Sequence, residues 1–295
     1  MLGVVNLDKP VGPTSHDMVD LVRRLTGMRR IGHAGTLDPL ASGVLPILVG
    51  AATRFSDDLT GGPKRYEAVI RLGVRSATDD AQGPLAVVAP PPELSQIAAA
   101  LALFVGTFEQ RPPAFSARKV AGEVAHRAAR AGHPVEATAR TVTVHAVDLL
   151  GTEAGDGWID LRCDIRCGAG TYIRSIARDL GERLGCGGYL NALRRTEAAG
   201  LLASAALSPA RLEELAASGR LGEALLPVGE LLHLPRLLLD AETAGRFLHG
   251  SSVNVTGQPG AGRHAVFQAG LLLGIGILSD GVLAPRTVIA GTDAA

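Results

Sequence analysis

The sequence predicts an α+β protein with two domains, and three observations support this prediction. The chain has 295 residues, about twice the roughly 150 residues of an ordinary domain. Hydrophobic residues make up 46% of the chain and charged residues 20%, a composition that can bury a sizeable core. Helix-like and strand-like segments are mixed over residues 1–230, whereas residues 231–295 hold short β-like runs between glycines. We therefore expect one domain over 1–230 and a small β-rich domain over 231–295.

The first helix is predicted from both of its ends. Thr14 or Ser15 follows a stiff loop with two prolines and is a preferred N-cap residue. Asp17 would lie near the positive end of the helix dipole, and Gly27 would end the helix.

The next elements are two strands and a second helix. Residues 31–43 are rich in Gly, Pro and small residues and are expected to form an ordered loop before a buried strand at 44–49. From Tyr66 to Val74 apolar and polar residues alternate, which is the period of a strand with one buried face. Three prolines at 90–92 would then break the chain before a helix at about 93–105.

The second half of the chain continues the mixture. The expected elements are a loop and Ala/Arg-rich helix within 111–132, a hairpin of strands 141–150 and 158–166, a helix at 171–184, and β-like runs at 252–255, 264–268 and 271–278.

Charge, cysteine content and hydropathy exclude several classes of protein. Lys plus Arg (29) equals Asp plus Glu (29), which excludes binding through a polybasic tail but not through local basic surfaces. An odd number of cysteines (3) in a long chain argues against a disulfide framework and favours a reducing cytoplasm. The first nine residues reach charge too early for a signal peptide. The most apolar run, 271–278, is far shorter than the roughly 20 residues that span a bilayer. We expect a cytoplasmic protein without a membrane segment.

The segment 32–43 is the most informative candidate site. Its glycines allow close approach of a ligand, and Pro39 favours an extended conformation at Asp38. An ionised Asp38 on a stiff loop, five residues after His33, could act as a nucleophile or base. On residue type alone, a plain turn that starts at Asp38 is the commoner explanation.

A buried carboxylate needs a cationic partner, and Arg174 is a candidate. It lies at or near a predicted helix start, where the helix dipole does not favour a cation, so a specific pairing with Asp38 would explain it. A surface arginine is the more common case. Tyr66 and Tyr172 are, by themselves, more often core aromatics than catalytic residues.

The sequence lacks the common metal-binding and cofactor-binding motifs, which favours chemistry without a metal or cofactor. The chain has no G-x-x-x-x-G-K-[ST] loop, no dinucleotide-binding G-x-G-x-x-G context, no H-E-x-x-H pair and no G-x-S-x-G elbow. Cys163 and Cys167 are four residues apart, but no further ligands follow at zinc spacing, so we predict ordinary core or strand cysteines.

Several motifs together resemble the bacterial TruB-type tRNA pseudouridine synthases. The resemblance covers residues 1 to about 230 and then weakens into a small PUA-like, RNA-binding module. It rests on segments that occur in this order: 6–15, 32–43, 64–66, 170–174, 180–182 and 193–196.

The resemblance implies a catalytic domain around a mixed, mainly antiparallel sheet, and an isomerase that converts uridine to pseudouridine at position 55 in the T loop of tRNA. Asp38 matches the family's nucleophile; whether it attacks the ribose or the base stays open. The implied substrate-binding residues are Tyr66, which packs on the uracil, Arg174, which pairs with Asp38, Tyr172 and Leu193 in the base pocket, and His33, which fills the gap left by the displaced nucleotide. Asp80 is a weaker site candidate in a looser version of the family's Thr/Asp-rich turn.

The implied partner is tRNA, bound as its T-arm with the target base flipped out, by a chain that needs no protein partner and acts as a monomer. Local basic clusters would follow the RNA backbone. They are Arg23 to Arg30, Arg118-Lys119 with Arg127 and Arg130, and Arg194-Arg195. Segment 111–132 resembles the family's RNA-binding insertion but departs from it at Phe115, Val124 and His126.

Two other functions remain as alternatives. A carboxylate-dependent N-glycosidase would use Asp38 and the same pocket but would release free uracil. A non-catalytic RNA-binding or tRNA-folding module would be indifferent to the loss of the Asp38 carboxylate.

Overall fold

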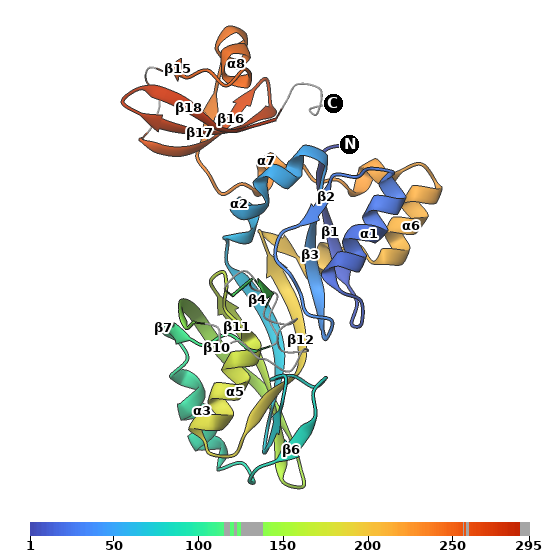
Figure 1. The fold of residues 1–295 in the computed structure, drawn as a ribbon, viewed down its shortest axis with the longest axis vertical. Coiled ribbons are helices and arrows are strands. Elements are labelled where there is room, and N and C mark those ends of the chain that lie inside the picture. The colour runs from blue at the N-terminus through green and yellow to red at the C-terminus, as the bar shows by residue number, and fades with distance from the viewer. Residues whose placement is uncertain (115–118, 121–122, 125–137, 256, 258–259, 290–295) are drawn as a thin grey trace.

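The computed structural model describes residues 1–114, 119–120, 123–124, 138–255, 257 and 260–289, and these residues form a large mixed sheet and a smaller second sheet (Figure 1). The main path of the large sheet has the order β1-β3-β12-β4-β11-β10-β7, with β2 beside β3 and β13 beside β12. All its pairings are antiparallel except the parallel contact of β12 with β3. The expected mixed, mainly antiparallel sheet is therefore confirmed.

The strands of the large sheet are β1 (Gly3–Lys9), β2 (Ile31–His33), β3 (Ala41–Val49), β4 (Lys64–Leu72), β7 (Gly106–Gln110), β10 (Arg140–Gly155), β11 (Trp158–Cys167), β12 (Gly188–Ala198) and β13 (Leu201–Leu202). Two short pairs lie apart from it: β5 (Val74–Ser76) with β6 (Leu85–Val87), and β8 (Lys119–Val120) with β9 (Glu123–Val124).

Helices cover the large sheet in two groups. The group α1 (Ser15–Thr26) and α6 (Pro209–Ala217) packs against the end of the sheet that contains β1, β2 and β3. The group α3 (Leu94–Ala102) and α5 (Ile173–Arg183) packs against the end that contains β4, β10 and β12 (Figure 1). No helix among the described residues is long and apolar enough to cross a bilayer.

The remaining short helices are α2 (Ser56–Thr60), α7 (Val228–Leu231) and α8 (Ala241–Leu248), with 3-10 turns η1 (Gly50–Phe55), η2 (Ala203–Ala205) and η3 (Leu221–Ala224).

Local sequence signals fix the first helix as predicted. Thr14 caps α1 by accepting a hydrogen bond from the Asp17 backbone N–H, and the Asp17 carboxylate accepts one from the Thr14 N–H in return. Gly27 ends the helix in the left-handed conformation, with φ of 67°. The alternating strand is also confirmed: Tyr66, Ala68, Ile70 and Leu72 are buried in β4.

Some expected boundaries were wrong. The segment expected as a loop over 31–43 begins with strand β2, which pairs with β3. Val74 belongs to β5 and not to β4, because Gly73 breaks the strand with φ of 100° and lies so close to Gly157 that a Cβ would be 2.2 Å from the Gly157 carbonyl oxygen. Strands β1 and β12 were not predicted.

The second sheet has the order β14-β16-β17-β18-β15. Its strands are β14 (Arg236–Leu238), β15 (Val253–Asn254), β16 (Gly262–Gln268), β17 (Leu271–Ser279) and β18 (Val282–Val288). It has its own core around Phe247 and Leu283, and a further apolar cluster joins Phe267 and Ile275 to Val4 and Phe55 of the first part. The predicted runs at 252–255, 264–268 and 271–278 thus fall on strands, while the division at 230/231 stays a prediction.

Candidate active site

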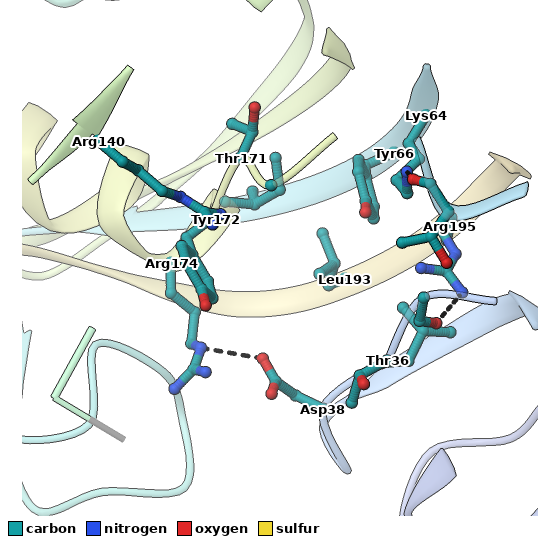
Figure 2. Close-up of a pocket in the computed structure, with 15 residues that line it drawn as sticks. Thr36, Asp38, Lys64, Tyr66, Arg140, Thr171, Tyr172, Arg174, Leu193 and Arg195 are labelled. Carbon is teal, nitrogen blue, oxygen red and sulfur yellow. Dashed lines mark hydrogen bonds and ion pairs between the residues drawn. The ribbon is translucent and has the colours of Figure 1, made fainter. Parts of the chain in front are cut away.

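A pocket of about 410 Å³ lies beside strands β4 and β12 of the large sheet (Figure 2). We call it the Asp38 pocket. Its lining comes from the loop after β2, the end of α2, the starts of β4 and β10, the loop before α5 with the first residues of that helix, and strand β12. The lining residues are Gly35, Thr36, Leu37, Asp38, Thr60, Lys64, Tyr66, Arg140, Gly170, Thr171, Tyr172, Ile173, Arg174, Leu193 and Arg195. Asp38 and four of the five predicted substrate-binding residues therefore line one pocket, although they come from four separate segments of the chain.

Strand β12 brings these segments together. Leu193 lies opposite Ala41 of β3 on one side and opposite Ala68 of β4 on the other. Arg195, two residues later, lies opposite Tyr66. In Figure 2 Leu193 stands between Tyr66 on one side of the pocket and Tyr172 on the other.

The loop that carries Asp38 is held by the start of the first helix. The Ser15 hydroxyl donates to the Leu37 carbonyl (3.0 Å) and accepts from the Leu37 N–H (2.8 Å), and Ser15 is buried. The Gly12 N–H donates to the Pro39 carbonyl at 2.8 Å. The loop is thus anchored on both sides of Asp38, so the carboxylate is presented by a rigid backbone.

Asp38 forms an ion pair with Arg174, with 3.0 Å between its Oδ2 and the arginine Nε (Figure 2). This is the pairing that the sequence predicted. The Arg174 side chain is 5% exposed, whereas the Asp38 side chain, which lines the pocket, is 38% exposed. A substrate that fills the pocket would therefore contact the carboxylate directly.

Asp80 lies behind this pair. Its Oδ2 is 3.5 Å from the Arg174 Nη1, and its Oδ1 accepts hydrogen bonds from the Thr78 hydroxyl (2.6 Å) and the Gln82 N–H (3.0 Å). Asp80 is buried and does not line the pocket, so it contacts Arg174 and not the space that a substrate would fill.

The electrostatic environment raises the pKa of Asp38 above its ordinary value. Withdrawal from water is the largest cause; Arg174 and Lys9 lower the pKa, and Asp80 raises it. Lys9 is itself buried, and burial lowers its pKa to about 8.

The opposite side of the pocket is formed by Tyr66, Lys64 and Arg195. Burial raises the pKa of Tyr66, and the Arg195 charge opposes that rise. The Lys64 Nζ donates to the carbonyls of Thr60 (2.7 Å) and Gly62 (2.8 Å), and burial lowers its pKa to about 8. These hydrogen bonds hold the Lys64 ammonium group in place beside Tyr66.

Arg195 is a correction to the sequence-based prediction, which placed it in a surface cluster for the RNA backbone. It is 1% exposed, and its guanidinium donates to the carbonyls of Val44 (2.7 Å) and Gly35 (2.9 Å). Nothing in the local sequence marks an arginine as buried, because its carbonyl acceptors come from β3 and from the loop after β2, both far away in the sequence. Its neighbour Arg194 is half-buried and binds Asp8 at 2.8 Å.

Tyr172 is held on the Arg174 side by its backbone and its ring. The Gln110 side chain donates to the Tyr172 carbonyl (3.0 Å) and accepts from the Tyr172 N–H (2.8 Å). The Arg140 guanidinium lies over the tyrosine ring, 4.8 Å from its centroid. The sequence did not single out Gln110, Arg140 or Lys64 as site residues, because their residue types carry no signal of burial.

His33 does not line the Asp38 pocket. It is half-buried in β2, and burial together with the Arg195 charge lowers the pKa of its imidazole. Its role against RNA stays a prediction. The residues Phe115, Arg118, His126, Arg127 and Arg130, with most of segment 111–132, lie outside the described residues.

No metal site appears in the described part of the chain, where no three His, Cys, Asp or Glu side chains are grouped as ligands. Cys163 and Cys167 are buried strand residues, as predicted, and burial raises their thiol pKa values to about 12 and about 11.

Comparisons with known proteins identify the family to which the chain belongs. The model of the TruB family pseudouridylate synthase N-terminal domain matches residues 23–173. The tRNA pseudouridylate synthase B C-terminal domain matches 174–244, and the C-terminal domain of pseudouridine synthase II TruB matches 235–289.

Curated relatives are similar over nearly the whole chain. The chain is 42% identical to tRNA pseudouridine synthase B of Ralstonia pickettii over 301 aligned positions, which cover 97% of this chain and 94% of the relative. It is 42% identical to the enzyme of the same name from a Synechococcus species over 298 positions, which cover 97% of each chain.

Solved structures share the fold. A chain in an H/ACA RNP bound to a substrate RNA containing 2'-deoxyuridine superposes with a TM-score of 0.75 at 24% identity, covering 99% of this chain and 86% of that chain. A chain in a Cbf5-Nop10-Gar1 complex gives 0.74 at 24% identity, with the same coverage. The family models and the curated relatives make the protein an isomerase, and the chain belongs to the TruB family of pseudouridylate synthases.

Proposed function

We propose that the protein isomerises uridine to pseudouridine in tRNA, at position 55 of the T loop, with Asp38 as the nucleophile acting on a flipped-out nucleotide. The single observation that carries the proposal is the Asp38–Arg174 ion pair in a pocket that also contains Tyr66, Tyr172 and Leu193. The similarity to tRNA pseudouridine synthase B supports tRNA as the substrate.

The reaction needs only the atoms of the substrate and one side-chain nucleophile. The bond between C1′ of the ribose and N1 of uracil breaks, the ring turns, and a new bond forms between C1′ and C5. The C5 proton then passes to solvent and N1 takes up a proton, so the product has the same atoms as the substrate. Asp38 attacks the ribose or the base and is released when the new bond forms. The loop anchored by Ser15 keeps the carboxylate in place, and Arg174 orients it.

The walls of the pocket exclude water around the detached base. Tyr66 is 7% exposed and packs on the uracil, while Tyr172 and Leu193 close the other sides. Exclusion of water matters because water would otherwise intercept the glycosyl intermediate and leave an abasic site. His33, in the strand that leads to the Asp38 loop, fills the space of the displaced nucleotide.

A target atom in a folded T loop is reached only if the nucleotide leaves its stack, at a cost of about a few kcal/mol. We propose that the enzyme acts on tRNA in the cytoplasm as a single chain. No protein partner or cofactor takes part in the proposed reaction.

The experiment that tests the proposal uses an unmodified tRNA transcript labelled with tritium at C5 of uridine. Wild-type protein should release tritium, and mapping should place one pseudouridine at position 55. Asp38→Asn should slow the release by about 10³-fold or more, since it removes the nucleophile. It should still bind tRNA, because Arg174 keeps Asp80 as a partner.

Asp156→Asn is the matched control, because Asp156 is exposed in the turn between β10 and β11. It should behave as wild type. Free uracil among the products would instead indicate an N-glycosidase, and an Asp38→Asn protein unchanged in every assay would indicate a non-catalytic RNA-binding module.

A further inference from the structure

The cations that line the Asp38 pocket differ in what they contact. Arg174 has the carboxylates of Asp38 and Asp80, Lys64 has two backbone carbonyls, and Arg195 has two backbone carbonyls. Each of these three side chains is buried. These three cations are therefore already engaged in contacts within the protein.

Arg140 is different from the other three. Within the described ranges it has no carboxylate or carbonyl partner, and its Nε is buried without any hydrogen-bond acceptor. It is half-buried, so among the described cations of the lining it is the one that reaches solvent, and it must lie at the rim of the pocket. An arginine in that position has N–H groups left for a ligand.

The protein nevertheless holds the guanidinium in a defined place. One face lies 4.8 Å from the centroid of the Tyr172 ring (Figure 2). The other contact is Gly170, where a Cβ would lie 2.7 Å from the Arg140 Nη2 and 2.9 Å from its Cζ. Only a residue without a side chain leaves room for the guanidinium, and Gly170 also has a φ of 86°.

We propose that Arg140, positioned by Gly170 and Tyr172, is a binding site for a backbone phosphate of the RNA strand that carries the flipped-out nucleotide. This inference rests on the proposed function. A nucleotide whose base enters the pocket leaves its phosphates at the rim, where Arg140 lies. The carboxylate of Asp38 disfavours a second anion deeper in the pocket, and a planar guanidinium matches two phosphate oxygens.

The test measures the affinity for unmodified tRNA at several salt concentrations. Each phosphate contact contributes about 0.7–0.9 to the slope of log affinity against log salt. Arg140→Gln should lower the slope by about that amount and weaken binding about tenfold near physiological salt. Arg140→Lys should keep the slope, because the charge remains, and should bind with intermediate affinity.

Two further variants separate the site from a general effect of charge. Gly170→Ala keeps the charge but pushes the guanidinium from its place, and should weaken binding while the slope changes less than in Arg140→Gln. Arg220→Gln makes the same change of net charge in an exposed pair with Glu223, and should leave the slope unchanged.

Steady-state kinetics complete the test. In Arg140→Gln the KM for tRNA should rise by the same factor as the dissociation constant, and kcat at saturating tRNA should be unchanged. An unchanged salt slope together with a fall in kcat would overturn the proposal and assign Arg140 to the orientation of Tyr172. Unchanged slope and affinity would also overturn it. If wild-type protein binds tRNA but releases no tritium, the proposed function fails, while the phosphate site is still judged by the slope.

Discussion

The contact of Gln110 with the backbone of Tyr172 offers a sharp test of how the pocket is held in shape. Gln110 is 1% exposed at the end of β7, and its amide makes two hydrogen bonds to the peptide groups of Tyr172. Tyr172 directly precedes α5, which has no side-chain cap at this end. Gln110 therefore fixes the backbone that carries Tyr172 and Arg174. We expect Gln110→Leu to disturb this backbone while it preserves the approximate size of the side chain.

The expected loss of stability follows from the two hydrogen bonds that Gln110→Leu removes. Two neutral hydrogen bonds contribute about 1–3 kcal/mol together, and an N–H group left without an acceptor adds a desolvation cost of similar size. The Tyr172 carbonyl keeps its helical bond from the Ile176 N–H at 3.3 Å, which reduces the loss. We therefore expect the free energy of unfolding to fall by about 2 kcal/mol. The value of kcat should fall by at least about tenfold, because Tyr172 and Arg174 lose their fixed position.

Gln110→Glu provides a matched comparison with an added pH signature. Its carboxylate still accepts from the Tyr172 N–H but faces the Tyr172 carbonyl without a proton to donate. Burial would raise the pKa of this carboxyl in the native state above that in the unfolded chain. The native state then binds more protons, so the stability of the variant should rise as the pH falls through the raised pKa. Protonation restores the missing donor.

The assay is urea unfolding, monitored by the fluorescence of Trp158. This is the single tryptophan, and it lies in β11 of the large sheet. Tritium release on the same samples gives kcat. The reasoning is refuted if Gln110→Leu changes the free energy of unfolding by less than about 0.5 kcal/mol. It is also refuted if Gln110→Glu shows the same pH dependence as wild type.

Two further predictions concern buried groups beside the pocket. The pKa of Lys64 is lowered to about 8, against 10.5 in the unfolded chain, so the unfolded state binds more protons between these pH values and stability should rise with pH across that window. Between these two pH values the free energy of unfolding of wild type should rise by about 3 kcal/mol more than that of Lys64→Met. Equal pH profiles of the two proteins in urea unfolding would contradict this. Gly43→Ala should lose more than about 3 kcal/mol, because the new Cβ would lie 2.1 Å from the Arg195 carbonyl oxygen at a φ of 102°. Gly219→Ala, at a φ of 71° in open space, should lose only about 1 kcal/mol, and similar melting temperatures for the two variants would show that the close contact relaxes freely.

Sequence patterns predicted the elements that depend on neighbouring residues. The cap at Thr14, the stop at Gly27 and the hairpin of β10 and β11 follow from residues a few positions apart, so they could be read locally. Strand β12 could not be predicted in this way, because its charged residues interrupt the alternation of apolar and polar residues. Its Arg195 is tolerated inside the protein only because carbonyl groups of β3 and the Gly35 loop accept its hydrogen bonds.

The candidate site shows the same division. The Asp38 loop stands out because glycines, Pro39 and a carboxylate occur together, and Arg174 stands out because a cation is unfavourable at a helix start. Lys64 and Arg140 gave no such signal, since a basic residue on a surface and one lining a pocket look alike in sequence.

The amino-acid sequence by itself determined the α+β class and the local helices and strands. It also determined which reactive side chains are available, above all the carboxylate of Asp38 and the guanidinium of Arg174. Only the tertiary structure decided how Asp38, Tyr66 and Arg174 are placed in one pocket, and that Lys64 and Arg195 lie buried beside them. The physical reason is the pairing of β12 in parallel with β3 and antiparallel with β4, through hydrogen bonds between strands more than a hundred residues apart. The alternation of residues along a strand does not say which strand will pair with it, so the geometry of the pocket exists only once the sheet has formed.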